Sequence, residues 1–211
     1  IVYGPLANGA TSVMFEGVPT YPDASRFLQI VDKYQISIFY TAPTAIRALA
    51  RLGEEWVDKC DLSSLRLLGT VGEPINPEAW MWYYTVIGGE RCPIVDTWWQ
   101  TETGWSIAAN CLGLHHYPVK EGSPTKAAPG WNLQVVDENC NPVKAGDIGA
   151  LVVKLPLPPG SLPTLWNNDD GYIKAYLEEF PGYYKTADAG FIDEDGYVFV
   201  MSRTDDIINV A

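Results

Sequence analysis

Hydrophobic residues in the first half of the chain follow a helical period in some segments and a strand period in others. Between Phe27 and Tyr34 they recur at i, i+3, i+4 and i+7, which predicts an amphipathic helix that begins at Pro22. Ile36, Ile38 and Tyr40 alternate at the strand period. Start and stop signals at Pro43, Gly53, Asn76 and Pro77 predict further helices at 43–52 and 76–84, and short apolar runs predict strands at 65–70 and 94–96. Strands that alternate with helices indicate an α/β fold with an open, mostly parallel sheet.

The pattern changes around residue 122. Strands are predicted at 131–136, 148–154 and 197–201, without helices of similar strength between them. An acidic turn at 193–196 joins 191–192 to the last strand, which is typical of a hairpin. A proline-rich connection at 155–163 and a short helix at 171–180 complete this half. We therefore expect an α/β subdomain over 1–121 and a small β-rich subdomain over 122–202.

Composition narrows the class of protein. The chain has 211 residues, of which 47% are hydrophobic and 12% aromatic, enough to bury a core. Its net charge of −12 repels phosphate, so we expect no nucleic-acid partner. No apolar run approaches the roughly 18 residues of a membrane span, so we expect no membrane partner. The four cysteines lack the close spacing of a zinc site. The apolar ends of the chain are typical of an internal piece of a longer protein.

Candidate chemistry follows the ends of two predicted strands, where open α/β sheets bind ligands. The segment 71–74 follows one strand, and 96–104 follows the next with two acids, two indoles and several hydroxyls or amides. This mixture suits a site that stacks a flat ring, contacts phosphate oxygens and holds a divalent cation. Asp188 and Arg203 could contact a ribose. The residues alone leave open that the indoles are core side chains, Asp188 a turn residue and Arg203 part of a surface ion pair.

Six segments, taken together and in order, resemble the short-chain, AMP-forming acyl-CoA synthetases of the adenylate-forming superfamily, and among them the acetate–CoA ligases. They are Tyr3-Gly-Pro-Leu, Phe15-Glu-Gly-Val-Pro, Tyr40-Thr-Ala-Pro-Thr-Ala-Ile-Arg, Gly69-Thr-Val-Gly-Glu-Pro-Ile-Asn, Asp96-Thr-Trp-Trp-Gln-Thr-Glu-Thr-Gly and Arg203-Thr-Asp-Asp-Ile-Ile-Asn-Val. The resemblance implies the second half of the large N-terminal domain of such an enzyme, followed by a β-rich subdomain. It also implies that 203–211 holds the hinge, at Asp205, and the start of a C-terminal domain.

The resemblance implies a two-step reaction. ATP activates acetate to acetyl-AMP, and transfer to coenzyme A then gives acetyl-CoA, AMP and pyrophosphate. ATP, Mg²⁺ and coenzyme A are the implied cofactors and co-substrates, and the family works in the cytoplasm or the mitochondrial matrix. The phosphate loop and the adenylation lysine of the family have no counterpart in these 211 residues, so we expect this piece to be inactive by itself.

The resemblance also implies a role for individual residues. The implied nucleotide contacts are Gly72, Glu73 and Pro74 along the adenine, Asp96, Thr97, Trp98 and Trp99 in the loop beside it, Gln100 and Thr101 near the α-phosphate, and Asp188 and Arg203 at the ribose. Glu102 corresponds to the Mg²⁺ carboxylate. Ala187 stands where the family usually has glycine, immediately before the ribose acid.

Trp99 and Val71 are the implied walls of the acyl pocket. One added methylene gains only ~0.8 kcal/mol by burial, whereas forcing it against a rigid indole costs about 1–3 kcal/mol. A short acid is therefore expected, with acetate first. Propionate is the alternative, because 155–160 and 197–203 are more similar to propionyl-CoA synthetases.

Two further alternatives are testable. A longer-chain acyl-CoA ligase or an amino-acid adenylation domain needs an open pocket at Trp99. A non-catalytic binding module that uses the 8 Trp and 12 Tyr residues would not be stabilised by ATP.

Overall fold

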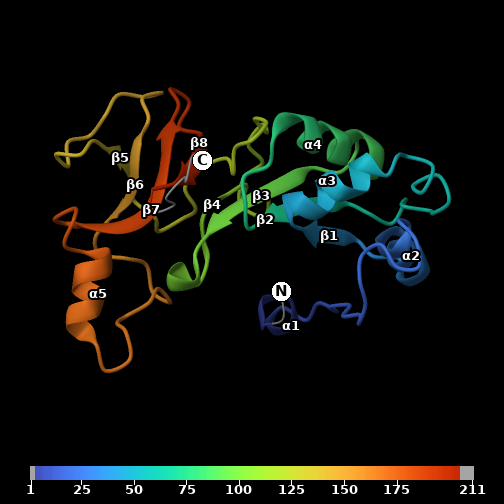
Figure 1. Ribbon diagram of the computed structural model, residues 1–211, viewed down its shortest axis with the longest axis horizontal. Coiled ribbons are helices and arrows are strands. Elements are labelled where there is room, and N and C mark those ends of the chain that lie inside the picture. The colour runs from blue at the N-terminus through green and yellow to red at the C-terminus, as the bar shows by residue number, and fades with distance from the viewer. Residues whose placement is uncertain (1–2, 205–211) are drawn as a thin grey trace, which may run out of the picture.

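The structure is a computed structural model that describes residues 3–204. Its elements form two four-stranded sheets, β1–β4 and β5–β8, which lie at opposite ends of the molecule in Figure 1. The helices are α1 (Tyr3–Ala7), α2 (Arg26–Tyr34), α3 (Pro43–Arg51), α4 (Pro77–Trp82) and α5 (Asp169–Tyr176). The strands are β1 (Ile38–Thr41), β2 (Leu67–Val71), β3 (Ile94–Trp99), β4 (Ser106–Ala109), β5 (Leu133–Val136), β6 (Gly149–Lys154), β7 (Tyr183–Ile192) and β8 (Val198–Arg203). Each helix among the described residues is too short or too polar to cross a membrane.

The first sheet has the order β1-β2-β3-β4. Its first two pairings are parallel and the third is antiparallel, so the predicted mostly parallel sheet is confirmed. The predicted end of β3 at Asp96 is wrong, because the strand continues to Trp99. Thr97 pairs with Val71 of β2 on one side, and Trp98 and Trp99 pair with β4 on the other. β4 was not among the strands predicted from the sequence.

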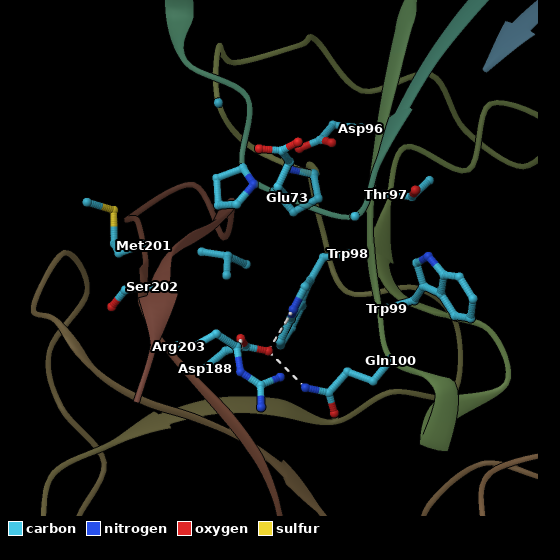
Figure 2. Close-up of a pocket in the computed structure, with 15 residues that line it drawn as sticks. Glu73, Asp96, Thr97, Trp98, Trp99, Gln100, Asp188, Met201, Ser202 and Arg203 are labelled. Atoms are coloured by element: carbon cyan, nitrogen blue, oxygen red, sulfur yellow. Dashed lines mark hydrogen bonds and ion pairs between the residues drawn. The ribbon is translucent and has the colours of Figure 1, made fainter. Parts of the chain in front are cut away.

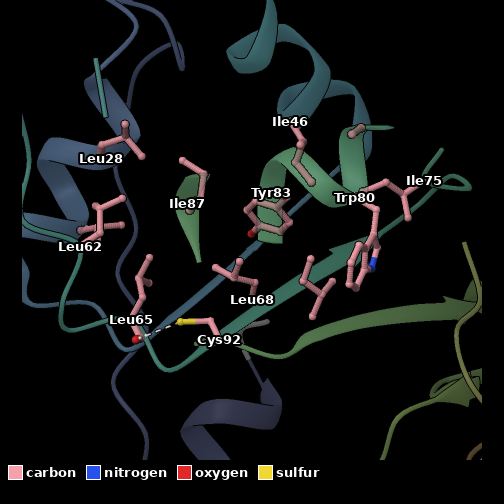
Figure 3. Close-up of a cluster of buried hydrophobic side chains, with 13 residues drawn as sticks. Leu28, Ile46, Leu62, Leu65, Leu68, Ile75, Trp80, Tyr83, Ile87 and Cys92 are labelled. Carbon is pink, nitrogen blue, oxygen red and sulfur yellow. Dashed lines mark hydrogen bonds between the residues drawn. The ribbon is translucent and has the colours of Figure 1, made fainter. Parts of the chain in front are cut away.

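A hydrophobic core holds α2, α3 and α4 against one face of this sheet, as Figure 3 shows. Leu68 of β2 and Ile94 of β3 point into it and are 0% and 2% exposed. Side chains two positions further along a strand lie on the same face. Thr70 of β2 and Asp96 of β3 therefore come directly after the core residues on this face of the sheet. The core thus determines at which position along each strand the polar residues begin.

Helix ends differ from the predictions in detail. The first of the predicted helices begins at Arg26 and not at Pro22, because Asp23 Oδ1 accepts a hydrogen bond from the Ser25 backbone N–H (2.9 Å) and holds a turn. The stop at Gly53 is confirmed by its φ of +87° just beyond α3. Asn76 stands at the N-cap of α4 but its side chain makes no capping hydrogen bond. After Trp82 the chain continues as a π-helical turn, Tyr83–Ile87.

The second sheet is antiparallel throughout, with the order β5-β6-β7-β8. The predicted β-rich second half is confirmed, but β7 is ten residues long and not only the pair 191–192. The predicted turn is present, since Asp193 Oδ1 accepts hydrogen bonds from the backbone N–H groups of Asp195 and Tyr197. The short helix begins at 169 and ends at 176 in place of the predicted 171–180. Its N-cap is Asn168, which accepts a hydrogen bond from Gly171 N.

Candidate functional site

A cavity of about 390 Å³ opens where the ends of β2 and β3 face β7 and β8 (Figure 2). Polar groups from both sheets therefore meet in one place, although they are far apart in the sequence. Ten residues singled out from the sequence line it: Gly72, Glu73, Pro74, Asp96, Thr97, Trp98, Trp99, Gln100, Asp188 and Arg203.

The lining also includes residues that sequence reasoning missed. They are Gly122, Pro124, Val200, Met201 and Ser202. The signal available for the last three was their position directly before Arg203. Val71, Thr101 and Glu102 are not among the lining residues. Asp205, the predicted hinge, lies outside the described residues.

Asp188 links the two sheets at the bottom of this cavity. Its side chain comes from β7 and the residue is 5% exposed. Oδ2 accepts hydrogen bonds from Trp98 Nε1 (3.0 Å) and Gln100 Nε2 (2.9 Å), which come from the end of β3. On the other oxygen, Arg203 Nε lies 3.9 Å from Oδ1. Figure 2 shows the Asp188 carboxylate bonded to Trp98 and Gln100, with the Arg203 side chain next to it.

A bulge in β7 sets the direction of Asp188. Leu151 of β6 pairs with Asp188 and the next residue, Val152, pairs with Lys185, so Thr186 and Ala187 are extra residues on β7. The Thr186 hydroxyl donates to the Leu151 carbonyl (2.6 Å) and fills the gap. Ala187 has a φ of +58°, in the left-handed region. This conformation explains why glycine is usual at this position of the resembling family.

Asp96 lies on the helix-covered face of β3. Thr70 Oγ1 donates a hydrogen bond to Asp96 Oδ1 (2.5 Å). Burial raises the pKa of Asp96 to about 6, although the hydrogen bonds from Thr70 and the Thr97 backbone act in the opposite direction. Asp96 is therefore an anion at neutral pH. Because it is buried, a further hydrogen-bond donor would stabilise its charge.

The opposite face of β3 carries Thr97 and Trp99. Figure 2 shows Trp98 and Trp99 on opposite sides of the strand. Because Val71 is in register with Thr97, these two side chains and Trp99 share one face. Tyr40 also reaches this face: its hydroxyl lies 2.7 Å from Thr97 Oγ1. Since Thr97 gives its own proton to the Thr70 carbonyl, Tyr40 is the donor of that bond.

Glu73 fastens the loop after β2 to the start of α3. Its carboxylate accepts hydrogen bonds from the Thr44 backbone N–H (3.0 Å) and hydroxyl, and it pairs with Arg47 Nη2 at 2.6 Å. Burial raises the pKa of Glu73, but the bonds from Thr44 and Arg47 outweigh that effect and hold the pKa below its usual value. The carboxylate thus positions the cavity wall.

Glu102 lies in the turn between β3 and β4, outside the lining of the cavity. Its Oε1 accepts a hydrogen bond from the Tyr176 hydroxyl of α5 (2.8 Å). Two residues earlier, Gln100 Oε1 accepts one from the Tyr184 hydroxyl (3.0 Å). The second sheet and its helix therefore hold this turn from outside the cavity.

An α/β unit with a polar cavity beyond its strand ends, closed by a β-rich unit, is the arrangement of a nucleotide-binding enzyme. Comparison with known proteins agrees, since the family model described as AMP-binding enzyme matches residues 1–158, and the chain belongs to that family. The acetyl-coenzyme A synthetases of Chlorobaculum tepidum and Methylobacillus flagellatus are each 54% identical to it over its whole length. The chain spans 32% of the length of each.

A solved structure has the same fold. The crystal structure of the anthranilate CoA ligase AuaEII in complex with anthranoyl-AMP matches 95% of this chain with a TM-score of 0.78 and 28% sequence identity. The match covers 36% of that ligase. The predicted fold class, part of an adenylate-forming enzyme followed by a β-rich unit, is thereby confirmed.

Proposed function

We propose that the full-length protein containing this chain is an AMP-forming acetate–CoA ligase. It converts acetate and ATP to acetyl-AMP and pyrophosphate, and then transfers the acetyl group to coenzyme A. The observation that carries the proposal is the single cavity that joins the segments 72–74 and 96–100 to Asp188 and Arg203. The acetyl-coenzyme A synthetases that match the whole chain support the choice of reaction.

In this proposal the nucleotide lies between the two sheets. The segment 72–74 lies along the adenine, while Asp96 and Thr97 of β3 contact the adenine and the rest of the nucleotide. Asp188 accepts hydrogen bonds from the ribose hydroxyls, and Arg203 contacts the same sugar. The bonds from Trp98 and Gln100 hold the Asp188 carboxylate in one orientation before the nucleotide arrives, which lowers the cost of ordering on binding.

The residues of the β3–β4 turn fit a magnesium ion. Mg²⁺ is usually held by one or two carboxylates together with water and substrate phosphates. Glu102 supplies a carboxylate and the exposed Thr101 a hydroxyl beside it. The ion, when bound with ATP, would neutralise phosphate charge. Gln100 and Thr101 lie near the α-phosphate in the same turn.

The chemistry needs positioning more than proton transfer. A carboxylate oxygen of acetate forms a bond to the α-phosphorus, and the bond from that phosphorus to the pyrophosphate oxygen breaks. In the second step the sulfur of coenzyme A bonds to the acetyl carbon, AMP leaves and the thiol proton is released. Both steps are accelerated by groups that neutralise and orient the phosphates.

Val71 and Trp99 form the acyl pocket in this proposal. Their shared face of the sheet, opposite to Trp98, supports it, since the acid then approaches from the side away from Asp188. A rigid indole at the end of the pocket favours acetate over longer acids. Propionate is the second candidate. Val200, Met201 and Ser202 favour it, because they lie in the cavity and belong to the segment that is more similar to propionyl-CoA synthetases.

Three narrower proposals accompany the function. The domain limits are those given above: 1–121, 122–202, and a hinge segment from 203 with Asp205. The piece of 211 residues is inactive by itself, as the adenylation lysine of the family has no counterpart in it. The reaction takes place in the cytoplasm, in agreement with the bacterial sources of the matching relatives.

The test is ATP–pyrophosphate exchange by the full-length protein with acetate, propionate and butyrate in parallel. Exchange with acetate or propionate and little with butyrate supports the proposal, and the rates rank the two acids. In the variant Trp99→Gly we expect butyrate to become a substrate, because the end of the pocket opens. Trp105→Gly is the matched control, since that indole is 65% exposed and does not line the cavity.

Two results would contradict the proposal. Exchange only with long-chain or amino acids would assign a different ligase. No exchange with any acid by a folded protein would favour the non-catalytic binding module.

A further inference from the structure

The turn that carries Glu102 is fastened by its backbone to the proline-rich connection. The Glu102 carbonyl accepts a hydrogen bond from the Leu162 backbone N–H (2.6 Å). A Cβ on Gly104, whose φ is +66°, would lie 2.5 Å from the Gly160 carbonyl oxygen. The backbone on both sides of the carboxylate therefore has a fixed position. What remains to be set is the orientation of the side chain.

Tyr176 sets that orientation. Its hydroxyl donates to Glu102 Oε1 at 2.8 Å. The ring is itself held in place, because it stacks on the Tyr184 ring with centroids 5.5 Å apart and an interplanar angle of 9°. Tyr184 is 0% exposed and its hydroxyl donates to Gln100 Oε1. The Tyr184 ring therefore cannot shift easily, and it holds the Tyr176 ring that stacks on it. Figure 1 shows α5, which carries Tyr176, beside the turn after β3.

We propose that Tyr176 is a positioning residue for magnesium: it holds one oxygen of the Glu102 carboxylate and leaves Oε2 as the ligand of the ion that arrives with ATP. The inference rests on the proposed function and adds a residue to it. Mg²⁺ demands near-ideal octahedral geometry, so the direction of a ligating oxygen matters more than for a larger ion. Partners that orient a metal ligand typically contribute about 10–100-fold to metal affinity.

The experiment measures ATP binding to the full-length protein by calorimetry, once with magnesium and once with EDTA. The ratio of the two affinities reports the contribution of the ion. For Tyr176→Phe we expect this ratio to fall about tenfold while the affinity in EDTA stays the same. Tyr172→Phe is the matched control. It removes the same atom one helical turn away, from a ring 5.5 Å from that of Tyr176, and should leave the ratio unchanged.

A double variant separates positioning from a general structural effect. In the background of Glu102→Gln, which removes the ligand charge, Tyr176→Phe should lower the ratio no further. An equal loss of affinity with and without magnesium, or no loss, would overturn the role of Tyr176. A Glu102→Gln variant with the wild-type ratio would overturn the magnesium role of Glu102 in the proposed function, and this inference with it.

Discussion

Ala187 stores backbone strain directly beside the carboxylate that joins the two sheets. Its φ of +58° costs an alanine about 1–2 kcal/mol, whereas glycine adopts it freely. Ala187→Gly should therefore stabilise the full-length protein, by about 0.5–1 kcal/mol after the extra freedom of glycine in the unfolded chain is subtracted. Urea unfolding of the variant measures this change.

The control for that variant is two positions away on the same strand. Ala189 has ordinary extended backbone, so Ala189→Gly should destabilise by about 0.5–1 kcal/mol. If both variants lose stability equally, Ala187 is not strained.

Asp96 predicts a pH dependence of stability. Its pKa in the folded protein, about 6, is above its ordinary value of 3.8. The unfolded chain therefore loses the proton first as pH rises, so this group lowers stability between these two values and the full penalty remains above the higher one. Asp96→Asn should be more stable than wild type at about pH 8, by on the order of 3 kcal/mol, and this gain should vanish below about pH 4. Denaturant unfolding at several pH values tests this, and a gain that does not vary with pH would contradict it.

At the scale of the elements, Gly69 permits the pairing of β1 with β2. A Cβ at this position would lie 2.3 Å from Cδ2 of the Tyr40 ring, and the ring is anchored by its hydrogen bond to Thr97. Gly69→Ala should therefore destabilise by about 2 kcal/mol. In a Tyr40→Leu background the same change should cost almost nothing, because the ring that it meets is absent. Thermal unfolding of the four proteins measures the coupling, and equal costs in both backgrounds would rule out this contact.

The elements that could be predicted from the sequence are those whose buried positions are apolar. The helices α2 and α3 and the strand β6 have such patterns and were found. The buried positions of β7 are Tyr184, Thr186, Asp188 and Gly190, of which only the first is a large hydrophobic residue. The alternation of buried and half-buried positions along β7 therefore leaves no hydrophobic pattern in the sequence. The end of β3 was hidden for a related reason, as its pairing with β4 depends on a strand that has no strong pattern of its own.

The segments that form the site could be predicted from the sequence, but the contacts between them could not. Resemblance singled out ten of the cavity residues, nine of which lie in the runs of characteristic residues given above; Asp188 lies outside those runs. Resemblance could not find Tyr176, since nothing near that residue in the sequence points to Glu102, 74 positions earlier. Contacts of this kind depend on how the second sheet and α5 fold back onto the first.

At the scale of the whole molecule, the cavity lies at the interface between the two sheets. Asp188 on one side and Trp98 and Gln100 on the other already bridge it with two hydrogen bonds. A nucleotide in the cavity adds contacts to both walls, so any opening that separates them must first release the ligand. At a free ATP concentration of 100 times Kd, we expect amide hydrogen exchange that requires this opening to slow by about 100-fold.

This slowing should appear together in β3 and β8 of the full-length protein, because one wall cannot open while the other keeps the nucleotide. α2 does not line the cavity, so its amides should exchange at the same rate with and without ATP. Arg203→Ala removes a contact to the nucleotide and weakens its binding, so at the same ATP concentration it should reduce the protection of β3 and β8 together. Hydrogen exchange read by mass spectrometry distinguishes these segments. Protection confined to β3 in the wild type would mean that the nucleotide binds the first sheet only and that the second sheet does not form part of the site.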